Sequence, residues 1–462
     1  MHLILILVVV AAVVASENAA AGPVPDAAGR LLIAAGAVVL LGLFAVGASR
    51  AIARGLRTDP AGYRPLLRRF SYLRRIHVVL WLAAAALILF GLDWVRIVRF
   101  NWQLDRAWLL DDLLVLAPVL LPLVVSWAAF YDVERAVRLG PGRDDTTERI
   151  ATRGQYVALH ARHYLGILLV PVLGLLAIQD AVQLFAPASI KSECQAVILP
   201  ATLGGLFLLF PAILRRLWQT RPLPPGPLRS RLEAVAERCR FRARDILVWH
   251  TNSMVVNAAV AGFVRPLRYV FLTDALLEQL TDDEIEAVFS HEVGHVRQHH
   301  LVFRLMSMLV PLSVWLLVGQ LFPQPVERFE RWVSLATVGS QAEVGLLFLA
   351  VMGLYAFIVF GYYSRLLEHQ ADLFACRALD AKSGRSAVET YARALEKLAA
   401  GNGQGRNTGG WQHASIARRV RFLDQLSLAP IRELRFRRWI GLLDALLVGI
   451  VLSPVICQIL LG

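Results

Sequence analysis

The stretch LTDDEIEAVFSHEVGHVRQHH, residues 280–300, predicts an amphipathic helix that carries four histidines and one glutamate in its last ten positions. Thr281 and Glu284 have the spacing of a capping box, in which the two residues satisfy each other's backbone N–H groups at the start of a helix. The acidic first turn suits the positive end of the helix dipole. An apolar face follows at helical spacing, made of Ile285, Val288 and Phe289.

Two of the histidines are placed to bind one metal ion. His291 and His295 are four residues apart, so their rings project from the same face of the helix. Glu292 lies about 100° around the helix from the first histidine, where it can take a proton from a water molecule at the metal. This is the zinc-peptidase motif HExxH. His299 and His300 have offsets that do not suit this face, and we expect them to be solvated or to support a ligand.

The motif match favours a metal site over a polar helix end that happens to be rich in histidine. With this composition, chance produces roughly 0.02 matches to such a pattern in the whole chain. A catalytic zinc also needs a third protein ligand. One class of zinc peptidase takes it from the position ten residues after the first histidine. Here that position is Leu301, so that class is excluded.

A third ligand is available in YYSRLLEHQADLFACRAL, residues 362–379. Glu368 and Asp372 are four residues apart and therefore share one helical face. Glu368 can complete a His-His-Glu site, and Asp372 can hydrogen-bond a ligand histidine from outside. Taken alone, the two carboxylates also suit the exposed face of an amphipathic helix. Their place just after an apolar span that returns to the motif's side of the membrane favours the metal site.

The chain as a whole is too apolar for an ordinary soluble protein. Of its 462 residues 57% are hydrophobic, and its mean hydropathy is +0.55. Apolar runs long enough to cross a bilayer as helices recur along it. We expect eight spans, at about residues 31–48, 76–95, 107–130, 163–186, 196–213, 302–321, 342–362 and 440–461.

Two features of the apolar part stay open. The first apolar stretch, residues 3–16, is short for a span and is either a span or part of a signal peptide. His77, Asp180 and Glu343 lie in or near spans. Ionisable residues are costly in lipid and often functional. These three either line a water-filled cavity or lie at the ends of spans.

The distribution of charge predicts the orientation of the spans in the membrane. The net charge is +13, and the arginines gather in alternate loops, as they do in the cytoplasmic loops of membrane proteins. Nucleic-acid binding is therefore not expected. The spans at 302–321 and 342–362 form an out-and-back pair, so the polar regions that flank them lie on the same face and can fold together. The four cysteines are far apart in sequence, and we expect no disulfide framework.

The motifs HEVGH and, two spans later, SRLLEHQAD resemble those of the integral-membrane zinc metallopeptidases that include HtpX and the type I CAAX prenyl proteases. The run into the first motif, NAAVAGFVRPLRYVFLTDALLEQLTDDEIEAVFSHEVGH, is similar to the same family. The resemblance covers about residues 235–425, whereas the first five spans share only general character. It implies one zinc ion per chain, held by His291, His295 and Glu368. It also implies that Glu292 is the general base.

The same resemblance implies residues that support the metal or position the substrate. Asp372 would support a ligand. Asn257 would begin an edge strand, NAAVA, along which a peptide lies as an added strand. WQHASIARRVRFL resembles an HPxxxxR element, in which His413 donates a hydrogen bond to the oxyanion and Arg419 braces the site. Ala414 stands where that family usually has proline, so His413 and Arg419 also fit a basic helix face near acidic lipid.

Together these features predict a mainly α, polytopic transmembrane protein with a cytoplasmic zincin-like α+β metallopeptidase domain. Residues 221–231, RPLPPGPLRSR, are expected to form a linker that leaves the membrane. We expect five segments: N-terminal transmembrane helices (1–213, five or six spans), a first peptidase part with the HExxH helix (214–301), a transmembrane hairpin (302–363), a second peptidase part with the third zinc ligand (364–438) and a C-terminal transmembrane helix (439–462).

The expected function is zinc-dependent endopeptidase activity on membrane-associated proteins, in membrane protein quality control. The alternatives are a CAAX-type processing protease, a zinc transporter or a signal-transducing membrane protein. A site-2-type intramembrane protease is disfavoured, because acidic residues precede HExxH and place it outside the bilayer. The expected partners are a peptide or protein substrate and the lipid bilayer, and the oligomeric state is not predicted. A lysine-poor composition rich in arginine, leucine and alanine indicates a bacterial source with a GC-rich genome, and we expect the protein in the cytoplasmic membrane.

Overall fold

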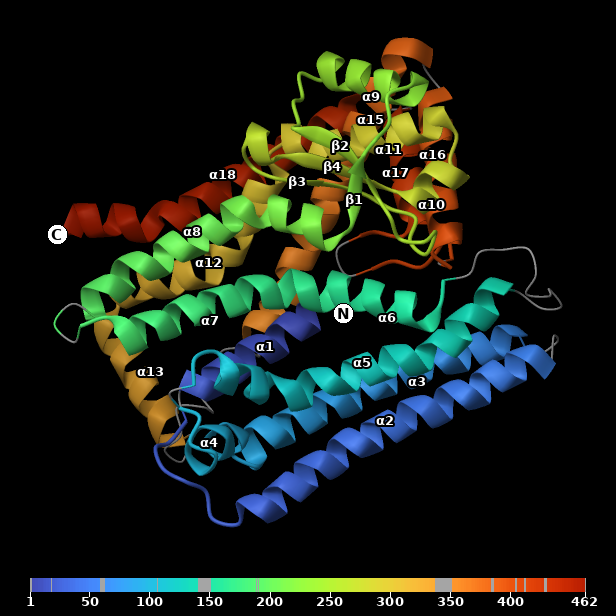
Figure 1. The fold of residues 1–462 in the computed structure, drawn as a ribbon. Helices are drawn as coiled ribbons and strands as arrows, with labels where there is room; N and C mark the ends of the chain where they lie inside the picture. Colours follow the sequence, from blue (N-terminus) through green and yellow to red (C-terminus); the bar gives the residue numbers. More distant parts are fainter. Residues whose placement is uncertain are drawn as a thin grey trace. The chain divides into compact units, whose positions relative to one another are not determined.

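The chain forms two compact units, Met1–Phe210 and Pro211–Gly462. The first unit is helical and the second combines helices with one small sheet (Figure 1), which confirms the mainly α fold with an α+β part. The computed structural model describes residues 2–17, 19–58, 63–105, 107–139, 151–187, 189, 191–336, 351–383, 386–403, 405–410, 413–427 and 430–461.

The first unit is built on three long helices: α2 (Ala27–Thr58), α3 (Tyr63–Ala86) and α5 (Leu110–Leu139). They pack through a cluster of buried aliphatic and aromatic side chains centred on Ile52, Phe70 and Val133. The other helices are α1 (His2–Glu17), α4 (Trp94–Arg96), α6 (Arg153–His160), α7 (Ile167–Phe185) and α8 (Lys191–Leu217), whose end lies in the second unit. Short π-helical turns occupy Leu87–Gly91, Ile97–Asn101 and Ala161–Gly166.

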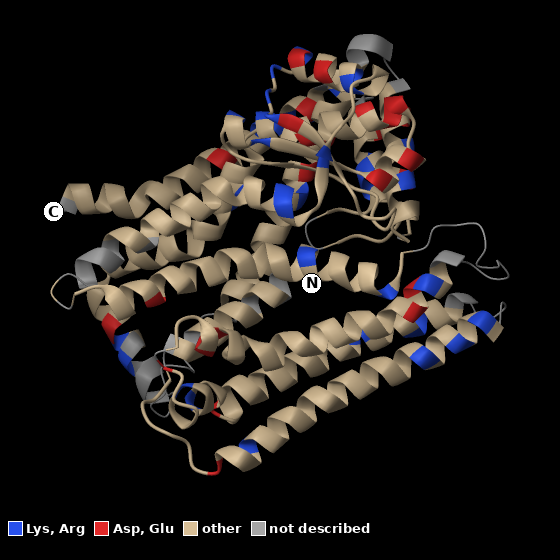
Figure 2. Ribbon diagram, viewed as in Figure 1, with Lys and Arg blue, Asp and Glu red and all other residues tan. Residues whose placement is uncertain are grey.

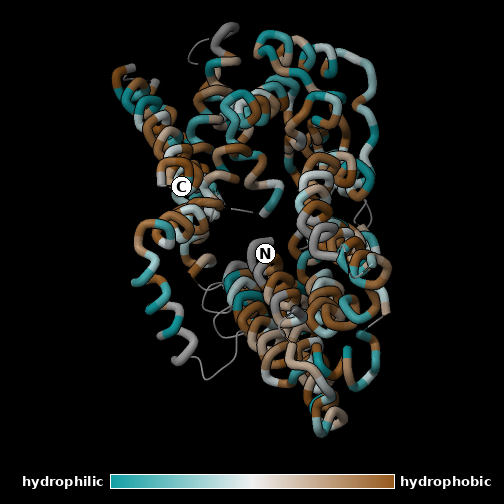
Figure 3. The backbone as a smooth tube through the Cα atoms, turned by 90° about the vertical axis from the view of Figure 1, so that its left-hand side faces the viewer, coloured by the Kyte–Doolittle hydropathy of each residue, from teal (hydrophilic) through white to brown (hydrophobic). Residues whose placement is uncertain are grey.

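Seven of the described helices are long and apolar enough to cross a membrane. They are Ala27–Thr58, Pro65–Gly91, Leu110–Val137, Arg153–Phe185, Pro200–Leu217, His300–Leu321 and Ile431–Leu460. Charged residues gather mainly at the ends of such helices (Figure 2), and hydrophobic residues follow most of their length (Figure 3). These helices confirm seven of the eight expected spans, and the chain is an integral membrane protein.

The remaining expectations about spans have mixed outcomes. The first residues of the eighth span, 342–362, lie outside the described residues, and so does Glu343. The first apolar stretch forms the 16-residue helix α1, which is shorter than the seven spans. The span expected at 76–95 ends early, because its helix stops at Gly91 and Asp93 adopts a left-handed backbone with φ of 52°. Aspartate is one of the few residues that tolerate this conformation.

Two ionisable residues of the spans make contacts within the first unit. His77 of α3 is buried, and its Nε2 lies 2.6 Å from the Oγ of Ser126 on α5. Asp180 of α7 accepts a hydrogen bond of 2.9 Å from the backbone N–H of Leu109, just before α5. Each contact joins two separate segments of the unit, which is a sufficient structural reason for a polar residue at these positions.

The second unit contains a four-stranded sheet in the order β1-β2-β4-β3. β2 and β4 are parallel, and the two outer strands are antiparallel to their neighbours. A hydrophobic core fills the space between this sheet, α9 and α11, with Leu232, Leu272 and Phe289 fully buried. The strands and these helices are β1 (Thr220–Pro222), β2 (Asp245–Trp249), β3 (Ala258–Ala261), β4 (Tyr269–Thr273), α9 (Pro227–Arg238) and α11 (Asp282–Arg297).

The linker expected at 221–231 is wrong. Its first residues belong to β1, and from Pro227 onward it forms the start of α9. Proline is accepted on an edge strand, where its missing N–H faces away from the sheet. It also suits the first position of a helix, where no intrahelical partner exists for an N–H. The prolines that suggested a linker therefore delimit two regular elements instead.

A second core brings the two motif-bearing helices together. α11 packs against α15 (Gly361–Ser383), α16 (Ser386–Gly401) and α17 (Ile416–Ser427) around Tyr391 and Leu423. Gly294 permits the close approach, because a Cβ at this position would lie only 3.1 Å from the ring of Phe374 on α15. The remaining elements are α10 (Asp274–Gln279), α12 (His300–Leu321), α13 (Pro323–Ala336), α18 (Pro430–Leu461), the 3₁₀ turn Arg265–Leu267 and the π-helical turn Ala356–Phe360.

Candidate active site

Helix α11 presents the HExxH motif, and its start is held by the expected capping box. The Thr281 hydroxyl accepts a hydrogen bond from the Glu284 N–H, and the Glu284 carboxylate accepts one of 2.8 Å from the Thr281 N–H. Lys397 of α16 donates a further hydrogen bond of 2.7 Å to Glu284. These contacts satisfy backbone N–H groups that a helix start leaves without intrahelical partners.

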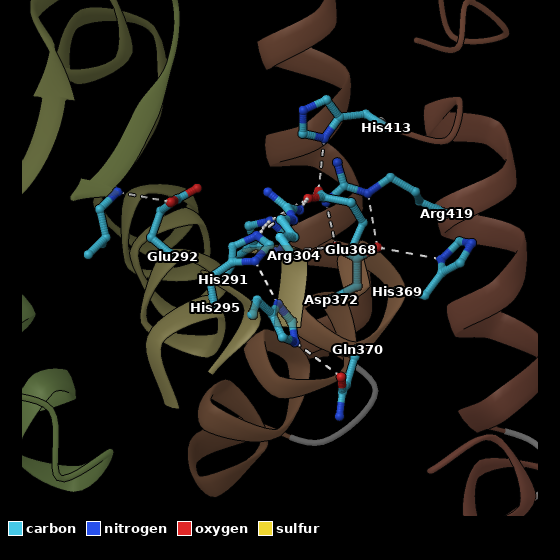
Figure 4. Close-up of polar contacts among 12 residues, drawn as sticks. His291, Glu292, His295, Arg304, Glu368, His369, Gln370, Asp372, His413 and Arg419 are labelled. Atoms are coloured by element: carbon cyan, nitrogen blue, oxygen red, sulfur yellow. Dashed lines mark hydrogen bonds and ion pairs between the residues drawn. The ribbon is translucent and has the colours of Figure 1, made fainter. Parts of the chain in front are cut away.

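Three side chains that could hold a metal ion converge at the packed faces of α11 and α15 (Figure 4). His291 Nε2 lies 3.2 Å from His295 Nε2. Glu368 reaches both rings, with its Oε2 3.6 Å from His291 Nε2 and its Oε1 3.5 Å from His295 Nε2. One ligand atom from each residue lies within 4.8 Å of the others. The structure therefore brings together the three residues that the sequence indicates as ligands.

This donor set fits a tetrahedral zinc ion. Ligand atoms about 2.0–2.1 Å from such an ion are about 3.3–3.4 Å apart. The two Nε2 atoms are 3.2 Å apart, Glu368 Oε2 lies 3.6 Å from that of His291, and Glu368 Oε1 lies 3.5 Å from that of His295, so either oxygen is close to the expected spacing from one histidine. Two imidazole nitrogens and one carboxylate also leave a fourth position, which catalytic zinc sites keep for water or substrate.

The outer nitrogens of both histidines have partners, so that the two Nε2 atoms point at the shared site. His291 Nδ1 lies 2.8 Å from the Tyr391 hydroxyl and 3.1 Å from Asp372 Oδ1. His295 Nδ1 lies 2.7 Å from His300 Nδ1. Such contacts fix the ring orientation of metal-binding histidines.

His299 and His300 take different roles. His299 is exposed, in a left-handed backbone conformation just before α12. His300 is buried, and its Nε2 contacts Gln370 Oε1 of α15 at 3.1 Å. The sequence left two expectations for these histidines, solvation or support of a ligand. His300 supports His295, and His299 is solvated.

Asp372 is the centre of a buried ionic network. Arg419 of α17 donates a hydrogen bond of 2.9 Å from Nε to Asp372 Oδ2, and a second from Nη2 to Oδ1. Arg419 Nη2 also lies 2.7 Å from the Tyr391 hydroxyl. Burial opposes the charge of Asp372, but Arg419 and His291 outweigh it and hold the pKa of the carboxyl below its usual range. The neighbouring Arg418 is exposed, so Arg419 is the arginine that touches the site.

The surroundings also shift the pKa values of the three candidate ligands. Burial would lower the pKa of His291, but hydrogen bonds with Asp372 and Glu368 outweigh it and raise the pKa to about 9. Burial holds the pKa of His295 well below its usual value. Burial also opposes the charge of Glu368, yet His291 and His413 hold its pKa well below the usual value. Glu368 is thus an anion held between two histidines, and a carboxylate anion is a suitable ligand for a divalent cation.

Glu292 lies in the same cleft but points away from the three ligands. Its Oε2 accepts a hydrogen bond of 3.2 Å from the backbone N–H of Val260 on β3 (Figure 4). Loss of water around the carboxylate raises the pKa of Glu292. A raised pKa makes a carboxylate a stronger base, which suits a group that accepts a proton beside the candidate metal site.

The cleft has a volume of about 540 Å³ and is bordered by the edge strand β3. Asn257 lies just before this strand, and its carbonyl oxygen accepts a hydrogen bond from the Thr273 N–H. β3 is an outer strand that pairs only with β4 in the described sheet. An outer strand beside the metal site is the type of element to which an extended peptide can add.

His413 and Arg304 both contact the carboxylate of Glu368. His413 Nδ1 lies 3.0 Å from Oε2, and the His413 side chain is 60% exposed at the mouth of the cleft. Arg304 of α12 donates a hydrogen bond of 2.8 Å from Nη2 to Oε1. The sequence offered no signal for Arg304 or Tyr391, since neither belongs to a local motif.

A family model matches the part of the chain that contains the candidate site. Residues 222–427, which contain α9, strands β2, β3 and β4 and all the site residues, match the model of peptidase family M48. This part of the chain is a peptidase family M48 domain. The resemblance indicated by the two motifs is thereby confirmed.

Individual relatives agree with the M48 assignment. The CAAX prenyl protease 1 homolog of Arabidopsis thaliana is 30% identical over 217 residues, which are 45% of this chain and 47% of that protein. The protease HtpX homolog of Aeropyrum pernix is 29% identical over 195 residues, 40% of this chain and 58% of that protein. The chain thus spans about half the length of the curated relatives it matches.

A solved structure shares the fold over most of the chain. The crystal structure of S. mikatae Ste24p matches with a TM-score of 0.55 and covers 86% of this chain and 99% of that chain. The sequence identity is 17%. At this identity the likeness concerns the fold alone, and the chemistry of the site depends on the residues described above.

Proposed function

We propose that this protein is a membrane-embedded zinc endopeptidase that hydrolyses peptide bonds of membrane-associated proteins. The observation that carries the proposal is the convergence of His291, His295 and Glu368 beside a carboxylate and an outer strand. The two Nε2 atoms are 3.2 Å apart, and each has a Glu368 oxygen at 3.5 or 3.6 Å. We propose one zinc ion per chain, held by these three side chains.

The residues around the ligands have distinct roles in this proposal. When bound, zinc supplies Lewis acidity, which polarises a carbonyl oxygen and lowers the pKa of water. Glu292 accepts a proton from the attacking water and passes it to the leaving amine. His413, at the mouth of the cleft, donates a hydrogen bond to the oxygen that becomes negative. Asp372, Tyr391 and Arg419 hold His291 in position.

The substrate is proposed to bind along β3, with the backbone near Asn257 and Val260 adding to the sheet. Quality control of membrane proteins is the proposed biological role, and the relatives named protease HtpX homolog support the protease activity. The arginine-rich loops support a cytoplasmic position for the M48 domain, in a bacterial cytoplasmic membrane. The five segments predicted from the sequence remain part of this proposal.

Processing of prenylated C-termini is the second candidate, because relatives at the same level of identity are named CAAX prenyl protease 1 homolog. Quantitative proteomics of membranes with and without the protein separates the two. Quality control predicts the accumulation of diverse membrane proteins. If only lipidated peptides accumulate, the processing role replaces it.

The direct test of the chemistry is the variant Glu292→Gln. It keeps the size and the hydrogen-bonding oxygen of the side chain but cannot accept the proton, so peptide hydrolysis should fall by about 10²-fold or more. Zinc content, measured by plasma mass spectrometry, should stay at the wild-type level.

A matched control is Glu389→Gln, at an exposed position of α16. It should keep both the activity and the zinc of the wild type. Wild-type cleavage of a casein-type substrate by Glu292→Gln would remove Glu292 from the mechanism.

A further inference from the structure

A second pocket of the Pro211–Gly462 unit adjoins the active-site cleft and is rich in arginine. Its volume is about 490 Å³. The ends of α9 and α11, the middle of α15 and the start of α18 form its walls. One acidic residue, Glu433, lines it, against five arginines: Arg238, Arg240, Arg297, Arg377 and Arg437. We refer to it as the arginine pocket.

Only part of this positive charge is neutralised inside the protein. Arg238 Nη2 forms an ion pair of 3.0 Å with Glu286, and Arg377 is paired with Glu433. Within the described part of the chain, three of the five arginines have neither a side-chain hydrogen bond nor an ion pair: Arg240, Arg297 and Arg437. Like charges gathered in one concave site attract a counter-ion, and guanidinium groups bind phosphate oxygens in pairs.

The arginine pocket lies where two transmembrane helices leave the domain. The span of α12 begins at His300, two residues after Gln298, which lines the pocket. The span of α18 begins at Ile431, and Glu433 and Arg437 on its first turns line the same pocket. Basic residues at the ends of spans lie at the level of the lipid headgroups. A pocket lined by residues at the starts of both spans is therefore expected near the height of the phosphate groups of the bilayer.

The rest of the lining distinguishes a lipid from a free ion. Leu373, Phe374 and Ala378 of α15 provide an apolar wall beside the arginines. A small hydrated ion gains nothing from such a wall, whereas the glycerol and the first methylene groups of a lipid can pack on it. We propose that the arginine pocket binds the phosphate group of an anionic phospholipid from the surrounding leaflet. This binding uses none of the candidate metal ligands, while Arg240 and Arg297 line both the arginine pocket and the active-site cleft.

The proposal is tested by titrating the purified full-length protein, in neutral detergent micelles, with fluorescent short-chain phosphatidylglycerol. The double variant Arg297→Gln/Arg437→Gln should bind about thirty-fold more weakly than the wild type, since each arginine near a bilayer contributes about a five-fold factor. The matched control Arg421→Gln/Arg435→Gln loses the same charge at exposed positions outside the pocket. It should bind like the wild type. Equal affinities for both double variants overturn the proposal.

Two further measurements distinguish a loss of lipid binding from damage to the fold. Glu433→Gln removes the acidic residue of the pocket and frees Arg377, so it should bind phosphatidylglycerol about five-fold more tightly. No loss of stability produces tighter binding, and unchanged or weaker binding contradicts the proposal. Phosphatidylcholine should not compete. If inorganic phosphate competes as strongly as the lipid does, the ligand is a free phosphate and the lipid proposal is wrong.

Discussion

Tyr391 is the residue that connects the candidate metal site to the rest of the domain. Its hydroxyl contacts His291 Nδ1 at 2.8 Å, Asp372 Oδ1 at 2.7 Å and Arg419 Nη2 at 2.7 Å. In Tyr391→Phe these contacts are lost while the ring stays. Partners of metal-binding histidines typically contribute 10-fold to 100-fold in metal affinity, and we expect a loss of about this size, measured by zinc titration against a fluorescent chelator.

Tyr363→Phe is the matched control for this variant. In the wild type, the Tyr363 hydroxyl is hydrogen-bonded to Asp444 of α18 and contacts none of the three candidate ligands in the described structure. The control should therefore keep wild-type zinc affinity. Equal affinities for Tyr391→Phe and the wild type would mean that Asp372 alone orients His291.

The site residues differ in how far the sequence reveals them. His291, His295 and Glu292 are visible because helical spacing alone determines their relation, and Glu368 is visible because it has a local partner four residues away. Tyr391 and Arg304 have no such signal. They reach the site only because α16 and α12 pack near α11 and α15, and helix packing cannot be read from one sequence. The roles of the site residues in catalysis stay predictions.

At the scale of elements, the start of α11 depends on an ion pair that acid should break. Burial opposes the charge of Glu284, but Lys397 and Thr281 outweigh it and hold its pKa below the usual value of 4.5. A carboxyl with a depressed pKa stabilises the fold above its unfolded pKa, and that contribution disappears as the pH falls through the folded pKa. Glu284→Gln should therefore unfold more easily than the wild type at pH 7, by about 1 kcal/mol or less because Lys397 is partly exposed.

The difference in free energy of unfolding between the wild type and Glu284→Gln should shrink as the pH falls below 4.5. Thermal unfolding in detergent at a series of pH values measures this difference. Any loss of metal in acid affects both proteins and therefore does not change the comparison. Glu389→Gln on α16, which makes no contact with Lys397, serves as the control and should match the wild type throughout. A constant difference between Glu284→Gln and the wild type at every pH would show that charge on Glu284 is not what stabilises α11.

Some elements were predictable and others were not, for physical reasons. The apolar runs located seven spans because a bilayer sets their length, and the capping box located the start of α11. The segment 221–231 was taken for a linker, because the prolines of an edge strand and of a helix start look the same as those of a loop. The order of the sheet was not predicted, since the parallel pairing of β2 and β4 depends on a crossover.

At the scale of the whole molecule, the charge of the loops predicts which side of the membrane carries the M48 domain. Two single cysteines, introduced in a background without the native ones, test this. Glu389→Cys lies on α16 of the second unit, and Ser189→Cys lies in the arginine-poor loop between α7 and α8. A membrane-impermeant maleimide added to intact spheroplasts should label the variant at 189 and leave that at 389 unlabelled. Labelling at 389 without lysis would put the domain outside.

The most direct test of the central claim is the zinc content of Glu368→Gln, measured by plasma mass spectrometry on the purified full-length protein. Glutamine keeps the shape of the side chain but is a poor ligand, and only two protein ligands remain. We expect one zinc ion per chain in the wild type and in Glu389→Gln, and almost none in Glu368→Gln. A full zinc ion in Glu368→Gln would contradict the claim that Glu368 completes the site with His291 and His295.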